Sequence, residues 1–221
     1  MDSRWEVYRQ GLQGHPTIPH TEYKKEDLEY VLEFLPKGSF VLDIGCADGK
    51  ETLALQELGY NVIGLTNDGA GNVINYINKT IPTIKVYNMD MNCLLFKSEY
   101  FDCVYMKHTF EHSFSPFIFM LELNRVLKEG GLILTEHPIY VKDSPMEIYR
   151  IYYHHPNLLT KERHEDLFKS TGFKIEKVDY MDGNCHRYLL RKDSSILHSD
   201  VSSALKVVKD YTYNRNLNLY A

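Results

Sequence analysis

Short apolar runs alternate with amphipathic segments along most of the chain. The apolar runs cover residues 40–44, 61–65, 84–87, 101–106 and 132–135, which is the usual length of buried strands. Between them, residues 26–35, 50–58, 72–79 and 115–128 carry apolar side chains at helical spacing, and several of these segments end at a glycine or a proline. Strands that alternate with helices in this way predict an α/β domain built on a mostly parallel sheet.

The pattern changes after residue 160. A helix is expected over 160–170 with Thr160 as its N-cap, followed by strands over 173–180 and 186–191 that an Asp182–Gly183 turn joins as an antiparallel hairpin. Residues 1–25 are polar and irregular, and we interpret them as an N-terminal arm that either packs loosely or covers a ligand. An aromatic insert at about 138–160 lies within the predicted domain over 26–191, and residues 192–221 form a C-terminal tail.

The stretch from residue 40 to residue 58 predicts a strand, a tight turn with two glycines, and a helix. Gly45 allows a ligand to approach the backbone, and Gly49 allows the helix and the strand to pack closely. The turn matches neither common phosphate-binding motif: the third glycine of a dinucleotide fingerprint is missing, and Glu51 stands where a P-loop needs serine or threonine. Asp43 at the strand end would repel a pyrophosphate but attract a cation or an ammonium group. The ligand is therefore expected to carry positive charge.

Two motifs resemble those of the class I S-adenosylmethionine-dependent methyltransferases. The first is Val41-Leu42-Asp43-Ile44-Gly45-Cys46-Ala47-Asp48-Gly49, and the second is Glu122-x-x-Arg125-Val126-Leu127-Lys128-x-Gly130-Gly131. The resemblance covers roughly residues 38–137 and extends more loosely to about residue 191. It implies a Rossmann-like, doubly wound, mostly parallel seven-stranded sheet with a closing antiparallel hairpin and helices on both faces. It also implies that the cofactor is S-adenosylmethionine.

The resemblance further implies where the cofactor binds. The matching positions are Asp43, Gly45, Cys46, Ala47, Gly49, Thr66, Asn67, Asp68, Asp90, Met91 and Lys107. The family's second strand usually ends in an acid that binds both ribose hydroxyls, and Thr66 departs from that pattern. Asn67 or Asp68 could supply the contact, although Asp68 could equally cap the next helix. Asp90 and Met91 match positions that hold the adenine, and Asp90 could instead be a turn residue.

Candidate catalytic residues follow the fourth predicted strand, at the sheet edge where doubly wound folds place their chemistry. Methyl transfer to a hydroxyl group is helped by a base of near-neutral pKa, and His108 and His112 stand where such a base is expected; His137 is a third candidate. His112 could instead belong to a Glu-His pair that supports the cofactor loop. The order His108-x-x-Glu111-His112 also matches an inverted zinc-protease motif, but a strand precedes it and no third ligand is evident, so no metal is expected.

Composition narrows the class of protein. The 221 residues fit one α/β domain with modest extensions. A formal net charge of −5 and the lack of a long basic run argue against a nucleic-acid partner. The four cysteines form no Cys-x-x-Cys pair, the N-terminus does not resemble a signal peptide, and no stretch approaches the ~20 apolar residues of a membrane span. We expect a soluble cytoplasmic protein without membrane contact.

These observations predict a methyltransferase that acts on a small molecule or a saccharide, by O- or N-methylation through in-line displacement. Enzymes that methylate DNA amino groups usually carry an Asp- or Asn-Pro-Pro-aromatic run after the fourth strand, and residues 107–110 differ from it. The Pro-Cys nucleophile of cytosine-carbon methylation is also missing. The alternative is a non-catalytic or regulatory protein that keeps the fold, because Thr66 departs from the family pattern. The sequence does not indicate the acceptor atom or the oligomeric state.

Overall fold

The computed structural model describes residues 28, 31, 33–67, 72–141, 157–181 and 184–214. Its strands are β1 (Phe40–Ile44), β2 (Asn61–Thr66), β3 (Lys85–Asn88), β4 (Phe101–Lys107), β5 (Leu127–Pro138), β6 (Phe173–Met181) and β7 (Cys185–Lys192). Its helices are α3 (Lys50–Glu57), α4 (Asn72–Thr80), α5 (Pro116–Val126), α7 (Lys161–Ser170) and α8 (Ser199–Asn214), with short 3-10 turns η1 (Phe110–His112) and η3 (Ser194–Ile196). The predicted N-terminal arm, most of the predicted insert and the Asp182–Gly183 turn lie outside the described residues.

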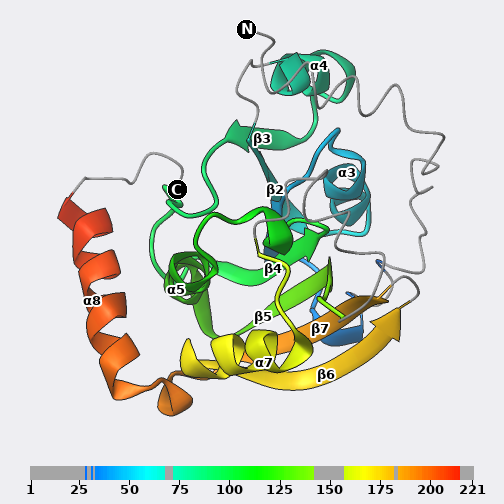
Figure 1. Cartoon of the computed structure of the whole chain (residues 1–221). Helices are drawn as coiled ribbons and strands as arrows, with labels where there is room; N and C mark the ends of the chain where they lie inside the picture. Colours follow the sequence, from blue (N-terminus) through cyan, green and yellow to red (C-terminus); the bar gives the residue numbers. More distant parts are fainter. Residues whose placement is uncertain are drawn as a thin grey trace, which may run out of the picture.

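One seven-stranded sheet forms the centre of the molecule, with the strand order β3-β2-β1-β4-β5-β7-β6 (Figure 1). The first five strands in the chain run parallel to one another, whereas β7 runs antiparallel to both β5 and β6. This confirms the predicted doubly wound sheet with a closing antiparallel hairpin. The strand order reverses between β1 and β4, and such a switch point opens a crevice at the carboxyl ends of the strands.

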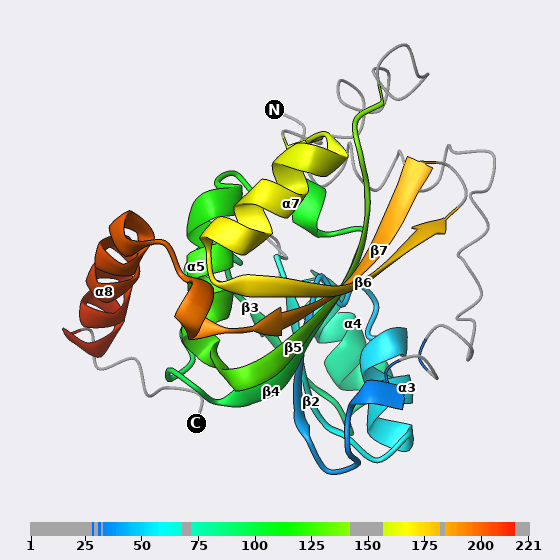
Figure 2. The same ribbon diagram turned by 90° about the horizontal axis from the view of Figure 1, so that it is seen from below.

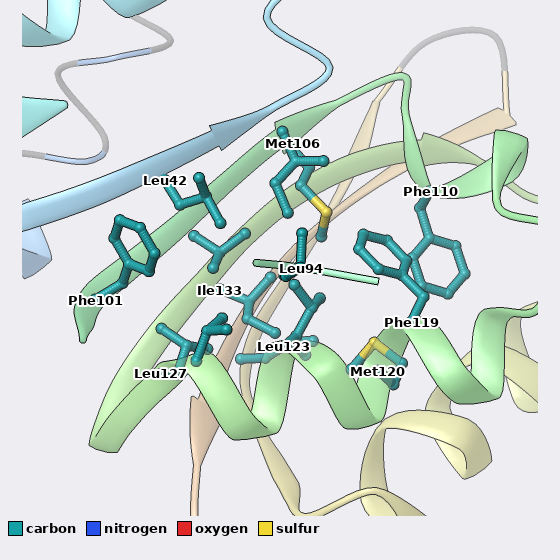
Figure 3. Packing of buried hydrophobic residues seen from close by; sticks show 14 of the residues in the cluster. Leu42, Leu94, Phe101, Met106, Phe110, Phe119, Met120, Leu123, Leu127 and Ile133 are labelled. Atoms are coloured by element: carbon teal, nitrogen blue, oxygen red, sulfur yellow. The ribbon is translucent and has the colours of Figure 1, made fainter. Parts of the chain in front are cut away.

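Helices cover both faces of the sheet (Figure 2). Alternate residues of β4 divide between the faces, as the two-residue period of a strand requires. Val104 and Met106 pack in a cluster with α5 and α7, whereas Cys103 and Tyr105 pack with α3 and with the helical residues Leu28 and Val31. In Figure 3 the apolar side chains of α5 face those of β1, β4 and β5. An apolar cluster on each face therefore packs the sheet against its helices.

The junction between α5 and β5 differs from the prediction. The sequence predicts a helix to residue 128 and a strand that starts at residue 132, but α5 ends at Val126 and β5 begins at Leu127. Leu127 has extended backbone angles and pairs with Phe101 of β4, across an irregular register. Its side chain is fully buried in the core of the α5 face. The extended conformation of Leu127 allows both the pairing with Phe101 and the burial of its side chain. These tertiary contacts override the helical pattern of residues 127 and 128.

A buried ion pair anchors the segment before β4. The Arg125 side chain is fully buried, and its Nε and Nη2 atoms each donate to a Glu122 carboxylate oxygen at 2.9 Å. The same guanidinium donates to the carbonyl oxygens of Leu94 and Phe96, and the Leu94 N–H donates to Glu122. A buried charge pair is tolerated when its remaining donors are satisfied, as they are here. The pair therefore ties the chain between β3 and β4 to helix α5.

Helix α8 follows the sheet and packs against α5 through Val201 and Leu205, which contact Leu121. The four cysteines are free thiols. Within the part of the chain that the structure describes, no helix has the length and apolar character needed to cross a bilayer.

Candidate active site

The carboxyl ends of the parallel strands meet at one edge of the sheet. Ile44 of β1 pairs with Leu65 of β2 on one side and with Met106 of β4 on the other, so the segments that follow these strands emerge together. Lys107 pairs with Glu136 of β5, which adds the end of that strand to the same edge. The structure thus brings together the predicted residues of the glycine turn, Thr66, and the segment from Lys107 to His112.

The glycine turn has the backbone that its sequence requires. Gly45 and Gly49 have φ values of 83° and 81°, and Ala47 between them has a φ of 45°. A Cβ atom at Gly45 would overlap the Thr109 side chain, so the close approach of the segment after β4 requires glycine there. Gly45 and Ala47 are exposed, whereas the Cys46 side chain turns inward and would collide with a Cβ atom at Gly64. The turn therefore presents bare backbone at the edge.

Asp43 lies beneath this turn and is almost fully buried, with 2% of its surface exposed. The Thr52 hydroxyl in the first turn of α3 donates to its Oδ2 atom at 2.6 Å. Burial raises the pKa of the Asp43 carboxyl to about 7; the Thr52 hydrogen bond opposes the shift and the nearby Glu51 carboxylate adds to it. An ionised carboxylate here is destabilised, and a positively charged ligand at the turn would relieve that cost.

The end of β2 and the segment after β3 lie next to each other. Thr66 pairs with Asn88 of β3, and its carbonyl oxygen accepts from the Met89 N–H at 3.1 Å. Thr66 is half-buried and Asn67 is exposed, whereas Asp68 lies outside the described residues.

Asp90 starts a turn. Its Oδ1 atom accepts from the backbone and side-chain N–H groups of Asn92, at 2.8 Å and 2.9 Å, which is the geometry of a turn-forming aspartate. Asp90 is exposed, and Met91 packs partly against the core. The Ser113 hydroxyl donates to Asn92 Oδ1 at 2.8 Å and so links this turn to the segment after η1.

Lys107 is the last residue of β4 and lies on the face covered by α3. Its Nζ atom is 4.0 Å from Glu51 Oε1, and the Tyr105 hydroxyl donates to the same oxygen at 3.4 Å. Glu51 therefore ties the start of α3 to the end of β4, beside Asp43.

His108 occupies the centre of the edge, with half of its side chain exposed. Its φ of 49° is uncommon for a residue with a side chain. Its Nδ1 atom is 3.7 Å from Glu111 Oε1, and its Nε2 atom is 3.6 Å from Glu136 Oε1. The Glu111 carboxylate is the main cause that raises the pKa of His108; Glu136 adds to the effect, while burial and Lys107 oppose it.

His112 ends the 3-10 turn η1 and is half-buried. The segment from His108 to His112 is therefore a tight turn, whereas the zinc-protease motif needs a regular helix. In the described ranges, no group of three His, Cys, Asp or Glu side chains is arranged to hold a metal ion.

His137, the third candidate base, is fully buried on the α5 and α7 face of the sheet. Its ring stacks on Tyr188, with centroids 5.5 Å apart, and its centroid is 4.4 Å from that of His164. Burial lowers the pKa of His137 well below its usual value and lowers that of His164 to about 4. Both rings are therefore neutral at physiological pH, and His137 faces the core rather than the edge.

Sequence reasoning did not single out Glu136, Arg187 or Thr52, and it considered Glu111 only as part of a Glu-His pair or of a zinc motif. Glu111 and Glu136 face His108, Arg187 donates to Glu136 Oε2 at 2.7 Å and 3.1 Å, and Thr52 supports Asp43. Arg187 reaches the edge because β7 pairs antiparallel with β5, with Arg187 opposite Glu136. Glu136 could have been found, since it directly follows the strand predicted over 132–135 and stands next to His137.

Comparison with known proteins connects this geometry to a family. Residues 42–135 match the family described as "Methyltransferase domain". The chain is 25% identical over 171 residues to a protein of Mycolicibacterium smegmatis named as a probable S-adenosylmethionine-dependent methyltransferase. It is 33% identical over 107 residues to the 2-methyl-6-phytyl-1,4-hydroquinone methyltransferase of a Synechocystis strain.

These matches are partial. The first covers 75% of this chain and 66% of the relative, and the second covers 47% and 33%, so the chain spans less than two thirds of either relative's length. A solved structure of an S-adenosylmethionine-dependent methyltransferase from Methanosarcina mazei has a TM-score of 0.63 at 17% identity, over 76% of this chain and 98% of that one. This structural likeness shows that the two proteins share a fold.

Proposed function

We propose that this chain transfers a methyl group from S-adenosylmethionine to a small molecule, because its residues 42–135 match the methyltransferase-domain family and a relative is named as a probable S-adenosylmethionine-dependent methyltransferase. The observation that carries the proposal is the buried Asp43 carboxylate beneath a bare glycine turn. A carboxylate in this place attracts a ligand with positive charge, and S-adenosylmethionine has both a sulfonium and an ammonium group.

The edge offers a place for each part of that cofactor. Asp43 and the turn residues Gly45, Cys46, Ala47 and Gly49 would hold its charged amino-acid end, with Lys107 alongside. Asp90 and Met91 would contact the adenine. Thr66 and Asn67 would contact the ribose, and Asp68, the other candidate for that contact, lies outside the described residues. The fit rests on the exposed backbone of the turn at Gly45 and Ala47, and on the close packing of Gly45 against Thr109 that leaves no room for a Cβ atom there.

When bound, S-adenosylmethionine supplies an electrophilic methyl group, whose bond electrons stay on the sulfur as the acceptor atom forms the new bond. The protein must then align the acceptor and, if the acceptor is a hydroxyl, remove its proton. We assign the removal of that proton to His108, because its ring is half exposed and stands at the end of β4 beside the glycine turn. His112 is the second candidate, and its place at the end of η1 puts it farther along the chain from β4.

The acceptor class rests on sequence and on comparison. The chain carries neither of the motifs considered above for methylation of DNA, and its formal net charge is −5. One relative is named for a hydroquinone acceptor, which is a small molecule with phenolic hydroxyls. Both points favour a small-molecule acceptor.

Calorimetric titration tests the proposal. Purified protein is titrated with S-adenosylmethionine and separately with S-adenosylhomocysteine, and the Asp43→Asn variant serves as the control. Micromolar binding that the variant weakens would support the cofactor and its site. If neither compound binds, the result supports the alternative of a non-catalytic or regulatory protein that keeps the fold, which the departure at Thr66 favours.

A further inference from the structure

Buried polar atoms without a hydrogen-bond partner gather around Glu111. Within the described part of the chain they include Glu111 Oε2, His137 Nε2, Asn157 Nδ2 and both ring nitrogens of His164. Buried polar groups in native proteins are nearly always paired, so a cluster of unpaired ones requires an explanation. The cluster lies directly behind His108, between η1, the end of β5 and α7.

Among these unpaired atoms, the Oε2 atom of the Glu111 carboxylate needs a partner most, because this group carries a negative charge when it is ionised. The Glu111 side chain is 1% exposed, and a carboxylate so deeply buried is stable only with an opposite charge nearby. His164 and His137 cannot supply that charge near neutral pH, because burial lowers the pKa of each ring. His108 can supply it, since its Nδ1 atom faces Glu111 Oε1 at 3.7 Å. Glu111 therefore stabilises the imidazolium form of His108, while the neutral ring can still donate its Nδ1–H to the same carboxylate and keep Nε2 free.

We propose that Glu111 is a positioning residue: it holds the His108 imidazole through Nδ1–H and so leaves Nε2 to take the proton of an acceptor hydroxyl. This inference rests on the proposed function and assigns that function to O-methylation. An amine acceptor attacks through its own lone pair and needs no such base, whereas a hydroxyl must lose its proton as the new bond forms. The proton moves from the acceptor oxygen to Nε2, and the imidazolium that results is stabilised by the Glu111 carboxylate.

Other charged groups also face His108, and their pairing distinguishes the effect of Glu136 on the ring from that of Glu111. From β5, Glu136 Oε1 is 3.6 Å from Nε2, but the Glu136 carboxylate is already paired with Arg187 of β7. Lys107 of β4 and the neutral His137 of β5 are also near the ring. Because Arg187 compensates Glu136 and no described side chain besides His108 pairs ionically with Glu111, Glu111 has the larger effect on His108.

The test is a titration of the histidine rings by NMR, using long-range proton–nitrogen correlations of the S-adenosylhomocysteine-bound protein. The resonances of His108 are assigned by their loss in His108→Gln. We expect the wild-type His108 to titrate above the usual histidine value and its neutral form to carry the proton on Nδ1. In Glu111→Gln, which keeps the size and removes the charge, the titration midpoint should fall. The matched control Glu136→Gln should lower it less.

Two outcomes would overturn the inference: a midpoint that does not move in Glu111→Gln, or a neutral ring protonated on Nε2. The tautomer is read on the wild-type protein, so the inference stays testable even if Glu111→Gln does not fold. Once an acceptor is identified, the acidic limb of the kcat profile should follow the same shift in Glu111→Gln, with the KM for S-adenosylmethionine unchanged. Failure of the proposed function would appear separately, as absence of cofactor binding in the wild type.

Discussion

Asp43 should make cofactor binding depend on pH. Burial raises the pKa of this carboxyl to about 7, so about half of the molecules carry it protonated at neutral pH. A positively charged ligand binds the ionised form, and binding therefore displaces a proton from the protonated fraction. Affinity for S-adenosylmethionine should rise as pH increases and level off above the pKa of Asp43.

The size of the effect follows from that pKa. Each pH unit below it costs about 1.4 kcal/mol of binding free energy, so affinity should fall roughly tenfold between about one unit above and one unit below the midpoint, and tenfold for each further unit. The ligand's own α-amino group titrates near 8 and acts only on the alkaline side. The acidic limb therefore reports Asp43 and not the ligand.

Calorimetry across about pH 5.5 to 8.5 measures how the affinity for S-adenosylmethionine falls on the acidic side. Substitutions of two neighbours of Asp43 should move the midpoint of that fall in opposite directions. Glu51→Gln removes a nearby negative charge and should lower the midpoint, whereas Thr52→Val removes a hydrogen bond to the carboxylate and should raise it. Asp43→Asn should flatten the limb and reduce the affinity at alkaline pH. An acidic limb that persists unchanged in Asp43→Asn would refute the reasoning.

Two further predictions concern stability. Gly45→Ala should lower the free energy of unfolding by about 2 kcal/mol or more in urea melts, because a positive φ costs a side-chain-bearing residue ~1–2 kcal/mol and the new Cβ overlaps Thr109. Adding Thr109→Ala to the same chain should restore only the part of this loss that the overlap causes. Full restoration of the unfolding free energy would exclude backbone strain. Asp43→Asn should stabilise the protein by up to roughly 4 kcal/mol at about pH 8, because the folded-state pKa of Asp43 lies above the unfolded value of 3.8 and ionisation therefore reduces stability as pH rises from 4 to 7. In thermal melts, the extra stability of the variant over the wild type should shrink as pH falls through that range. A stability difference that does not depend on pH would contradict this prediction.

The elements that sequence predicts well are those in which local pattern and tertiary packing agree. The strand from residue 40 to 44 and the glycine turn after it appear as predicted, because apolar burial and backbone freedom act on the same residues. The start of β5 at Leu127 does not, since pairing with Phe101 competes with a helical pattern. Contacts between distant segments were harder to foresee: no local pattern indicates that Thr109 lies against Gly45, or that Arg187 reaches Glu136.

The departure at Thr66 raises the importance of Asp43. In the resembled family a carboxylate at the end of the second strand shares the recognition of the cofactor, and a threonine hydroxyl carries no charge to do the same. Among the described residues that match cofactor positions, Asp43 is the buried carboxylate, while Asp90 is exposed and already bonded to Asn92. The electrostatic part of cofactor affinity should then depend mainly on Asp43. That dependence explains why a destabilising buried acid would be kept beneath the turn: the charge that weakens the folded protein is the one that a cationic ligand needs.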